Sequence, residues 1–264
     1  MTHNSMQLYI AEHMLLINAP SVISGPTTRP TYVLIWSTTD RHFTLTDEAG
    51  KLLFEGKAAL IAPNVKRQLK TIDSNIFSLN IEPGHPYYLI LSRLKFNQGL
   101  IPLNIQQFSS YSNLLELSFE TDNFQQINTI SNELTNLLLP FENQQNQRDE
   151  RISTLLPLLE SNNPLELASL SKKVGISQSH LSHLFSKEIG MSIKSYILWR
   201  RYRRAMLALQ NGEKISTIAQ LVGFYDHAQM SRTFLSLFGY APSILKRPEF
   251  IRISSDFNEI QDHF

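Results

Sequence analysis

The sequence contains no cysteine, and only 10 of its 264 residues are glycine. Without cysteine the chain has no disulfide, thiolate nucleophile, iron–sulfur cluster or cysteine zinc site. It also lacks an apolar run near the roughly 20 residues that a membrane-spanning helix needs. Its first ten residues, MTHNSMQLYI, lack the basic and apolar regions of a signal peptide. We therefore expect a cytoplasmic protein without a membrane partner.

A strong overall charge is missing too, because the net charge is only +1. The two halves differ, however. Residues 1–147 hold 9 Lys and Arg against 12 Asp and Glu, whereas residues 164–252 hold 13 against 5. A basic module attracts polyanions such as nucleic acid. With about 150 residues per domain, the sequence predicts two domains, of which only the second meets a polyanion.

The first half has the pattern of a β domain. Short apolar or alternating runs separated by turn residues recur about every ten residues, which is typical of a β-sandwich or small barrel. The strands are expected at 32–36, 42–46, 51–54, 58–62, 67–71, 76–81 and 87–91. Trailing helices are expected at about 103–140, where apolar residues from 124 to 138 fall three or four apart. This apolar face packs either on its own barrel or against a second copy of the chain.

The second half contains a repeat. Val174-Gly175-Ile176 recurs 48 positions later as Val222-Gly223-Phe224. Glycine suits the left-handed position at a helix end, and Ser177 and Asp226 follow as candidate caps of the next helix. The pattern predicts two helix-turn-helix units, at about 165–189 and 215–238.

A helix expected at about 193–210 connects the two units. Eighteen residues rising about 1.5 Å each span about 27 Å, close to the roughly 34 Å of one turn of duplex DNA. Opposite its apolar stripe lies an arginine cluster, part of which we expect to form ion pairs within the protein. The cluster consists of Arg200, Arg201, Arg203 and Arg204.

The stretches LASLSKKVGISQSHLSHLFSKEIGMSIKSYI, RRYRRAMLAL and ISTIAQLVGFYDHAQMSRTFLSLFGYAPS resemble the AraC/XylS family of bacterial transcription regulators. GKAALIAPNVKRQLKT is similar to the metal-free cupin-like barrel of many members. The resemblance implies an α+β protein of two domains, with a cupin-like β-barrel or sandwich before an all-α double helix-turn-helix domain. The expected parts are a sensing and dimerisation domain (1–142), a linker (143–150), a DNA-binding domain (151–252) and a tail (253–264).

The resemblance also implies a sequence-specific regulator, usually an activator acting near RNA polymerase, whose two units read adjacent major grooves of double-stranded DNA. Residues of each second helix that are not needed for burial are free to face the groove. Arg232 is the strongest candidate, since arginine can bond both guanine acceptors. The predicted DNA-binding residues are Ser177, Gln178, Ser179, Ser182, His183, His227, Ala228, Gln229, Arg232 and Thr233.

Other functions have less support. A cupin-like enzyme would need histidines and a carboxylate converging on a metal, and no H-x-H pair occurs in the first half, so no catalytic, cofactor or metal residue is predicted. A small apolar effector is one means of control, and a protein partner is the alternative; a homodimer through the trailing helices is a further expectation. The candidate effector pocket consists of Trp36, Phe43, Phe54, Phe77 and Tyr88, which as aromatic residues at strand spacing also fit a plain core.

Overall fold

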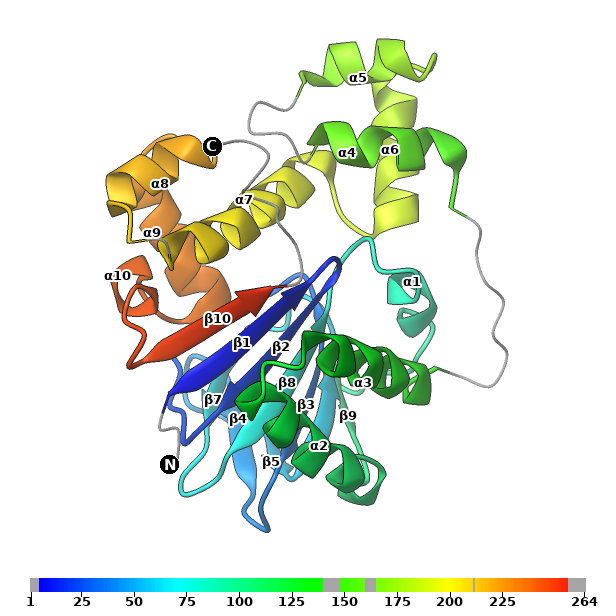
Figure 1. Ribbon diagram of the computed structural model, residues 1–264. Coiled ribbons are helices and arrows are strands. Elements are labelled where there is room, and N and C mark those ends of the chain that lie inside the picture. The colour runs from blue at the N-terminus through cyan, green and yellow to red at the C-terminus, as the bar shows by residue number, and fades with distance from the viewer. Residues whose placement is uncertain (1–4, 140–147, 160–164, 211, 256–264) are drawn as a thin grey trace.

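The structure is a computed structural model that describes residues 5–139, 148–159, 165–210 and 212–255. A β-rich domain from the first half of the chain lies beside a group of helices from the second half (Figure 1). The prediction of a two-domain α+β protein is therefore confirmed. The stretch 143–147 of the predicted linker and residues 256–264 of the predicted tail lie outside the described residues.

The larger of two sheets has seven strands. These are β1 (Met6–Ala11), β2 (Met14–Ala19), β3 (Tyr32–Ser37), β6 (Ala58–Ile61), β8 (Ile76–Ile81), β9 (Leu100–Pro102) and β10 (Ile251–Ser255). Their spatial order is β10-β1-β2-β8-β3-β6-β9, and only β10 and β1 run parallel. The last described segment of the chain thus forms an edge of the N-terminal sheet, at the point where the sequence predicted a tail (Figure 1).

Both faces of this sheet are covered, which explains why β3 is buried along its whole length. Side chains alternate between the faces of a strand. Tyr32, Leu34 and Trp36 therefore join the core on one face, and Val33 and Ile35 join the core on the other. A continuous apolar run is typical of a strand buried on both sides.

A smaller sheet covers part of the Val33 face. It consists of β4 (Phe43–Thr46), β5 (Leu52–Gly56) and β7 (Gln68–Lys70) in the order β5-β4-β7. The prediction left a cupin-like barrel or sandwich open, and the described strands form two packed sheets without a closed barrel. The small sheet has only three to five residues per strand. It leaves room on this face for the C-terminal domain, whose Phe238 belongs to the same core.

Two helices cover the opposite face: α2 (Ser109–Glu120) and α3 (Phe124–Leu137). The apolar stripe of α3 packs on the molecule's own sheet, where Ile127 and Leu134 are fully buried. The Trp36 indole donates a hydrogen bond to the Ser112 hydroxyl at 3.0 Å. The trailing helices are thus firmly attached to the sheet that precedes them. The 3₁₀ turn η1 (Ile105–Gln107) leads into α2.

The strand predicted at 87–91 is wrong, since this segment forms the short helix α1 (Tyr88–Leu91). The preceding Pro83-Gly84-His85-Pro86 turn sets its direction. The amide of Tyr87 donates to the His85 ring nitrogen Nδ1 at 3.2 Å, and the amide of Tyr88 donates to the His85 carbonyl at 3.0 Å. These local bonds close a helical turn at this point of the chain.

The C-terminal domain is helical, and its two halves are attached differently. Its helices are α4 (Glu150–Leu159), α5 (Leu167–Lys173), α6 (Gln178–Ile189), α7 (Ile193–Leu209), α8 (Ile215–Leu221), α9 (His227–Phe238) and α10 (Pro242–Leu245). Leu155, Leu181 and Phe185 form a core of their own around α4 and α6. Met230 and Phe234 of α9 instead belong to the cluster that fills the β-sandwich. The second half of the helical domain therefore rests on the N-terminal domain.

Candidate nucleic-acid interface

Both predicted helix-turn-helix units are present, as α5–α6 and as α8–α9. In each, a glycine in the left-handed conformation follows the first helix, Gly175 with φ 69° and Gly223 with φ 85°. The side chains of Ser177 and Asp226 then cap the second helix. Each accepts a hydrogen bond from the amide three residues later, at 3.2 and 2.6 Å respectively. The repeat in sequence is thus a repeat in structure.

On α6 the predicted contact residues form an exposed surface. Gln178, Ser179, Ser182 and His183 are all exposed, opposite the buried stripe. The Ser182 hydroxyl donates to the carbonyl of Gln178 at 2.9 Å, so that part of its hydrogen-bonding capacity is already used. Sequence reasoning missed His180, which is exposed on the same helix. Its position outside the buried stripe, one turn after the cap, is the signal that would have identified it.

On α9 the two candidates with the longest polar side chains outside the helix cap, a histidine and an arginine, are the most accessible. His227 and Arg232 are exposed, whereas Ala228, Gln229 and Thr233 are half-buried. Arg232 makes no hydrogen bond or ion pair to any described residue. Its guanidinium is therefore available to a partner that lies against this helix.

Gln229 has a structural task that the sequence did not reveal. Its side-chain oxygen accepts a hydrogen bond from the Tyr225 amide at 2.9 Å, and the Thr233 hydroxyl donates to its backbone carbonyl at 3.0 Å. Gln229 and the Asp226 cap together satisfy amides at the start of α9. Tyr225 itself is 90% exposed, and sequence reasoning missed it. An aromatic residue directly before a helix cap was the available signal.

The connecting helix α7 explains the arginine cluster. Arg200, Arg203 and Arg204 are buried, and Arg203 is only 1% exposed. Its guanidinium lies 3.0 Å from the carboxylate of Glu82, at the end of β8. The Trp199 indole donates to the same carboxylate at 3.0 Å. The expectation that part of the cluster forms internal ion pairs is confirmed for Arg203.

Arg201 points elsewhere. It is half-buried and lines a cleft of about 500 Å³ between the two helix-turn-helix units. The same cleft is lined by Ser182 of α6 and Gln229 of α9, both predicted DNA contacts. Lys194 is its second cation, and no acidic side chain is among the described residues that line it. Burial lowers the pKa of Arg201.

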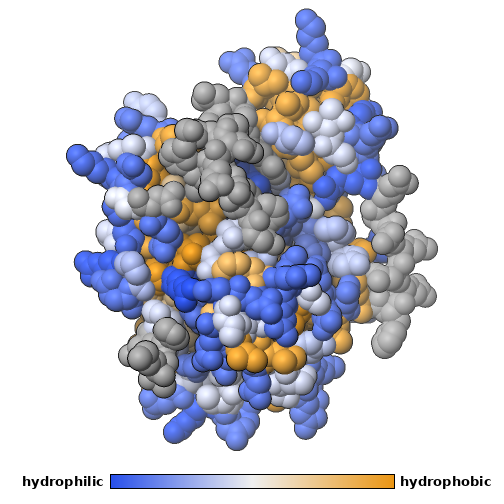
Figure 2. Space-filling view, viewed as in Figure 1, coloured by the Kyte–Doolittle hydropathy of each residue, from blue (hydrophilic) through white to orange (hydrophobic). Residues whose placement is uncertain are grey.

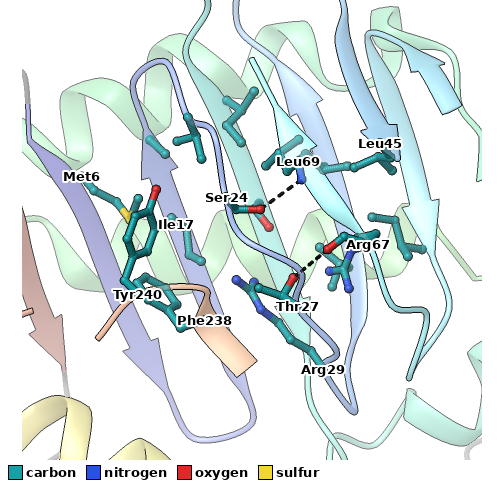
Figure 3. A pocket seen from close by; sticks show the side chains of 17 residues that line it. Met6, Ile17, Ser24, Thr27, Arg29, Leu45, Arg67, Leu69, Phe238 and Tyr240 are labelled. Atoms are coloured by element: carbon teal, nitrogen blue, oxygen red, sulfur yellow. Dashed lines mark hydrogen bonds between the residues drawn. The ribbon is translucent and has the colours of Figure 1, made fainter. Parts of the chain in front are cut away.

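A second space lies inside the β-sandwich, next to the C-terminal domain. This cavity of about 50 Å³ is mostly apolar, but Arg29 and Arg67 both line it (Figure 3). Phe238, the last residue of α9, and Tyr240, two residues after it, form part of its wall (Figure 3). The cavity is therefore bounded by both domains.

The two arginines in this cavity have only neutral partners. Arg29 donates from Nε to the Leu237 carbonyl at 2.6 Å and from Nη1 to the Asn80 side-chain oxygen at 3.0 Å. Arg67 donates to the Val65 carbonyl at 3.0 Å. No carboxylate among the described residues pairs with either. Burial, and next the charge of Arg29, lowers the pKa of Arg67 to about 9. The cavity thus carries uncompensated positive charge, which is costly in an apolar surrounding.

The five aromatic residues of the predicted effector pocket do not meet in one place, and none lines this cavity. Trp36 and Phe77 stack under α2 and α3, with ring centroids 5.3 Å apart. Phe43 and Phe54 pack between the sheets. The Tyr88 hydroxyl donates to the Pro30 carbonyl at 2.8 Å. Trp36 and Phe77 belong to the large sheet, Phe43 and Phe54 to the small sheet, and Tyr88 to α1. Strand spacing in the sequence does not show which sheet or which face an aromatic residue joins.

Two further findings concern the described part of the chain. It contains no group of three or more His, Asp or Glu side chains that could hold a metal ion. None of its helices is both long enough and apolar enough to cross a bilayer.

Comparison with known proteins places these features in a family. A model of a helix-turn-helix domain matches residues 170–247. The chain is 33% identical over 94 residues to the multiple antibiotic resistance protein MarA of Escherichia coli, a match that covers 34% of this chain and 74% of MarA. The chain belongs to the AraC/XylS family of transcription regulators.

Other relatives of this AraC/XylS chain are matched over shorter shares of their length. It is 36% identical over 84 residues to the Msm operon regulatory protein of Streptococcus mutans and 37% identical over 79 residues to the arabinose operon regulatory protein of E. coli. These matches cover 31% and 30% of this chain. They span 30% and 27% of the two relatives.

Solved structures of ToxT from Vibrio cholerae resemble the whole fold. The structure of an apo ToxT variant aligns with a TM-score of 0.53 at 15% identity, covering 88% of this chain and 96% of ToxT. ToxT bound to an unsaturated fatty acid aligns with a TM-score of 0.51 at 16% identity, covering 87% and 92%. At such low identity the likeness concerns the fold, a β-rich domain followed by a helical one.

Proposed function

We propose that this chain is a sequence-specific DNA-binding regulator of transcription that places α6 and α9 in successive major grooves on one side of the duplex. The observation that carries the proposal is the structural repeat. In both units a left-handed glycine follows the first helix, and a side chain at the equivalent position, Ser177 or Asp226, caps the second helix. The 17 residues of α7 that join them span about 26 Å. That length approaches one helical turn of DNA, and bending of the duplex can supply the difference.

The contacts within this proposal divide by task. His183, His227 and Arg232 are exposed and supply the base or phosphate contacts of longest reach. The Ser177 hydroxyl oxygen and the Gln229 side-chain oxygen accept backbone hydrogen bonds at the starts of α6 and α9. These two residues therefore contact DNA through their remaining donors, the Ser177 hydroxyl proton and the Gln229 side-chain NH₂ group. The other proposed contacts are Gln178, Ser179, Ser182, Ala228 and Thr233.

Selection from a library of random duplexes with the full-length chain tests this function. The expected result is two conserved half-sites whose centres are about 10 base pairs apart, bound from one side. Recovery of no consensus at moderate salt would contradict the proposal, because charge alone gives binding without sequence preference. An activator that contacts RNA polymerase would raise transcription from a promoter that carries the selected site; lowered transcription would indicate a repressor.

The sandwich cavity supports control by a small effector, and its chemistry favours a carboxylate with an apolar tail. Arg29 and Arg67 offer two guanidinium groups that no carboxylate of the described residues pairs with, and carboxylate is a preferred partner of arginine. ToxT, which shares the fold, has been solved with an unsaturated fatty acid. The cavity holds only about 50 Å³, whereas small-molecule pockets measure about 300–1,000 Å³. Binding therefore requires the wall to move.

Movement of that wall would reach the second recognition helix. The wall includes Phe238, the last residue of α9, and Arg29 is bonded to the carbonyl of Leu237 in the same turn. The Thr28 amide also donates to the Ser236 carbonyl at 2.8 Å. A ligand that recruits Arg29 would withdraw a bond from the end of α9. Effector binding and the position of α9 are coupled in this way.

Oleate is a suitable probe of the effector site. It should raise the melting temperature of the wild-type chain, and Arg67→Gln should abolish the rise while Arg41→Gln, on an exposed loop, retains it. An equal rise in Arg67→Gln would place the ligand elsewhere. No rise in the melting temperature of the wild-type chain would favour the alternative, in which a protein partner controls the regulator.

A homodimer through the N-terminal helices has a candidate surface on α2. Figure 2 shows an apolar patch over this helix, where Leu114 is 44% and Leu117 is 54% exposed. Leu117→Glu would shift the sedimentation of such a dimer to that of a monomer. An unchanged sedimentation coefficient would rule out this surface.

A further inference from the structure

The cleft between the two helix-turn-helix units contains an arginine, Arg201, that pairs with no other side chain among the described residues. Of the four arginines on α7, three are buried. Arg201 is half-buried, and it makes no hydrogen bond or ion pair to the described residues. Its Nε atom is buried without a hydrogen-bond partner. A guanidinium held in place but unsatisfied is prepared for an external acceptor.

The cleft around Arg201 is suited to an anion. Its cations are Arg201 and Lys194, and no described acidic residue lines it. Ile193, Ile197 and Leu198 of α7 supply apolar walls. Low-dielectric walls around charges of one sign concentrate the electrostatic field toward the opening. Ser186 adds a hydroxyl group that can donate to an anion, whereas the Ser192 hydroxyl already donates to Ser195 at 2.9 Å.

The position of the cleft identifies the anion, provided that the proposed function holds. The cleft is bounded by Ser182 on α6 and by Gln229 on α9. When both helices occupy successive major grooves on one side of a duplex, the minor groove and its two phosphate strands lie between them. We propose that Arg201, assisted by Lys194, binds the phosphate backbone of this central segment. The contact positions the protein and reads no base directly.

Binding to the selected duplex tests the role of Arg201. Arg201→Ala should weaken binding about tenfold, as expected for loss of a charge-assisted hydrogen bond. It should also reduce the slope of log K against log salt by about 0.9. Arg201→Lys should keep the slope, and Arg41→Ala, which removes the same charge from the N-terminal domain, should keep both quantities. Melting curves for each variant verify that the fold is retained.

Chemically altered DNA locates the contact. Uncharged methylphosphonate linkages in the central segment should weaken wild-type binding by the factor that Arg201→Ala causes, and should leave Arg201→Ala binding unchanged. Equal weakening of both proteins would overturn the assignment, as would Arg201→Ala binding with wild-type affinity. If Arg201→Ala changes the base preference in the central segment, the phosphate assignment is wrong and Arg201 contacts a base in the minor groove. Failure of the wild-type chain to select any duplex would contradict the proposed function and not this contact alone.

Discussion

Neighbouring arginines on α7 have different tasks because the β-sandwich covers only one side of the helix. Arg203 is buried against Glu82, whereas Arg201 faces the cleft between the units. The sequence places all four arginines off the apolar stripe, but it does not show which of them another domain covers. Trp199 and Glu82 are 117 residues apart in the chain. Contacts over such separations leave no local pattern.

The buried pair of Glu82 and Arg203 should be a sensitive point for stability. Glu82→Gln leaves the Arg203 guanidinium buried without its counter-charge, so the free energy of unfolding should fall by about 3–5 kcal/mol in urea titrations. Replacing both partners together, by Glu82→Leu and Arg203→Met, should cost less than the single change. A loss below about 1 kcal/mol in Glu82→Gln would show that the ion pair is not needed.

Arg232 should carry sequence preference on α9. Arg232→Ala should cost about 1–3 kcal/mol of binding free energy and relax the preference at one base pair. A comparison of affinities for all single-base variants of the selected site measures both effects. Uniform weakening on every sequence would instead assign Arg232 to a phosphate.

Helices and strands of this protein differ in how well the sequence predicts them. The helix-turn-helix units carry their own signals, since Ser177, Asp226 and the turn glycines act within a few residues of where they stand. β1 and β2 were not predicted; burial on both faces removes the alternation of a half-buried strand, and of these three strands only β3 was identified from its continuous apolar run. β10 pairs with β1 across 245 residues of chain, as its Ser255 hydroxyl bond to Ile10 illustrates. The sequence therefore predicted the two helix-turn-helix units better than the sheet on which the second unit rests.

Strand β10 should hold the two domains together. A chain ending at Glu249 loses the parallel pairing of residues 6–10 with residues 251–255, and exposes an edge of the large sheet. Its melting temperature should fall, and amides of β1 should exchange faster with solvent. A chain ending at Ser255 is the matched control and should behave like wild type. Equal exchange in both truncated chains would show that β10 does not stabilise the edge.

The second helices of the two helix-turn-helix units, α6 and α9, are supported by different parts of the protein. α9 belongs to the core that fills the sandwich, whereas α6 belongs to a separate core with α4. Toward the N-terminal domain, α6 packs near α1, where Tyr88 lies against Gly190. A change inside the sandwich therefore reaches the second unit directly. It reaches the first unit through α7, whose length sets the distance between the two helices.

Acid should weaken the contact between the domains through two histidines. Burial, and next the charge of Arg200, lowers the pKa of His13 to about 2; burial, and next Arg148, lowers the pKa of His85 to about 4. Arg203 also faces His13, and the carboxylate of Glu12, at 3.8 Å, is its acidic neighbour. Both histidines are therefore neutral in the folded protein at pH values where the unfolded chain already protonates them.

The sign and range of the pH effect follow from these values. Above pH 6.5 neither state binds the protons, and stability is complete. Below pH 6.5 the unfolded chain gains protons that the fold excludes, so each histidine should cost up to about 1.4 kcal/mol per pH unit. The cost should level off near pH 4 for His85 and continue below it for His13. Urea unfolding between pH 7.5 and 4.5 measures the decline, and His13→Gln together with His85→Gln should flatten it. A decline of the same steepness in the double variant would assign the acid sensitivity to other groups.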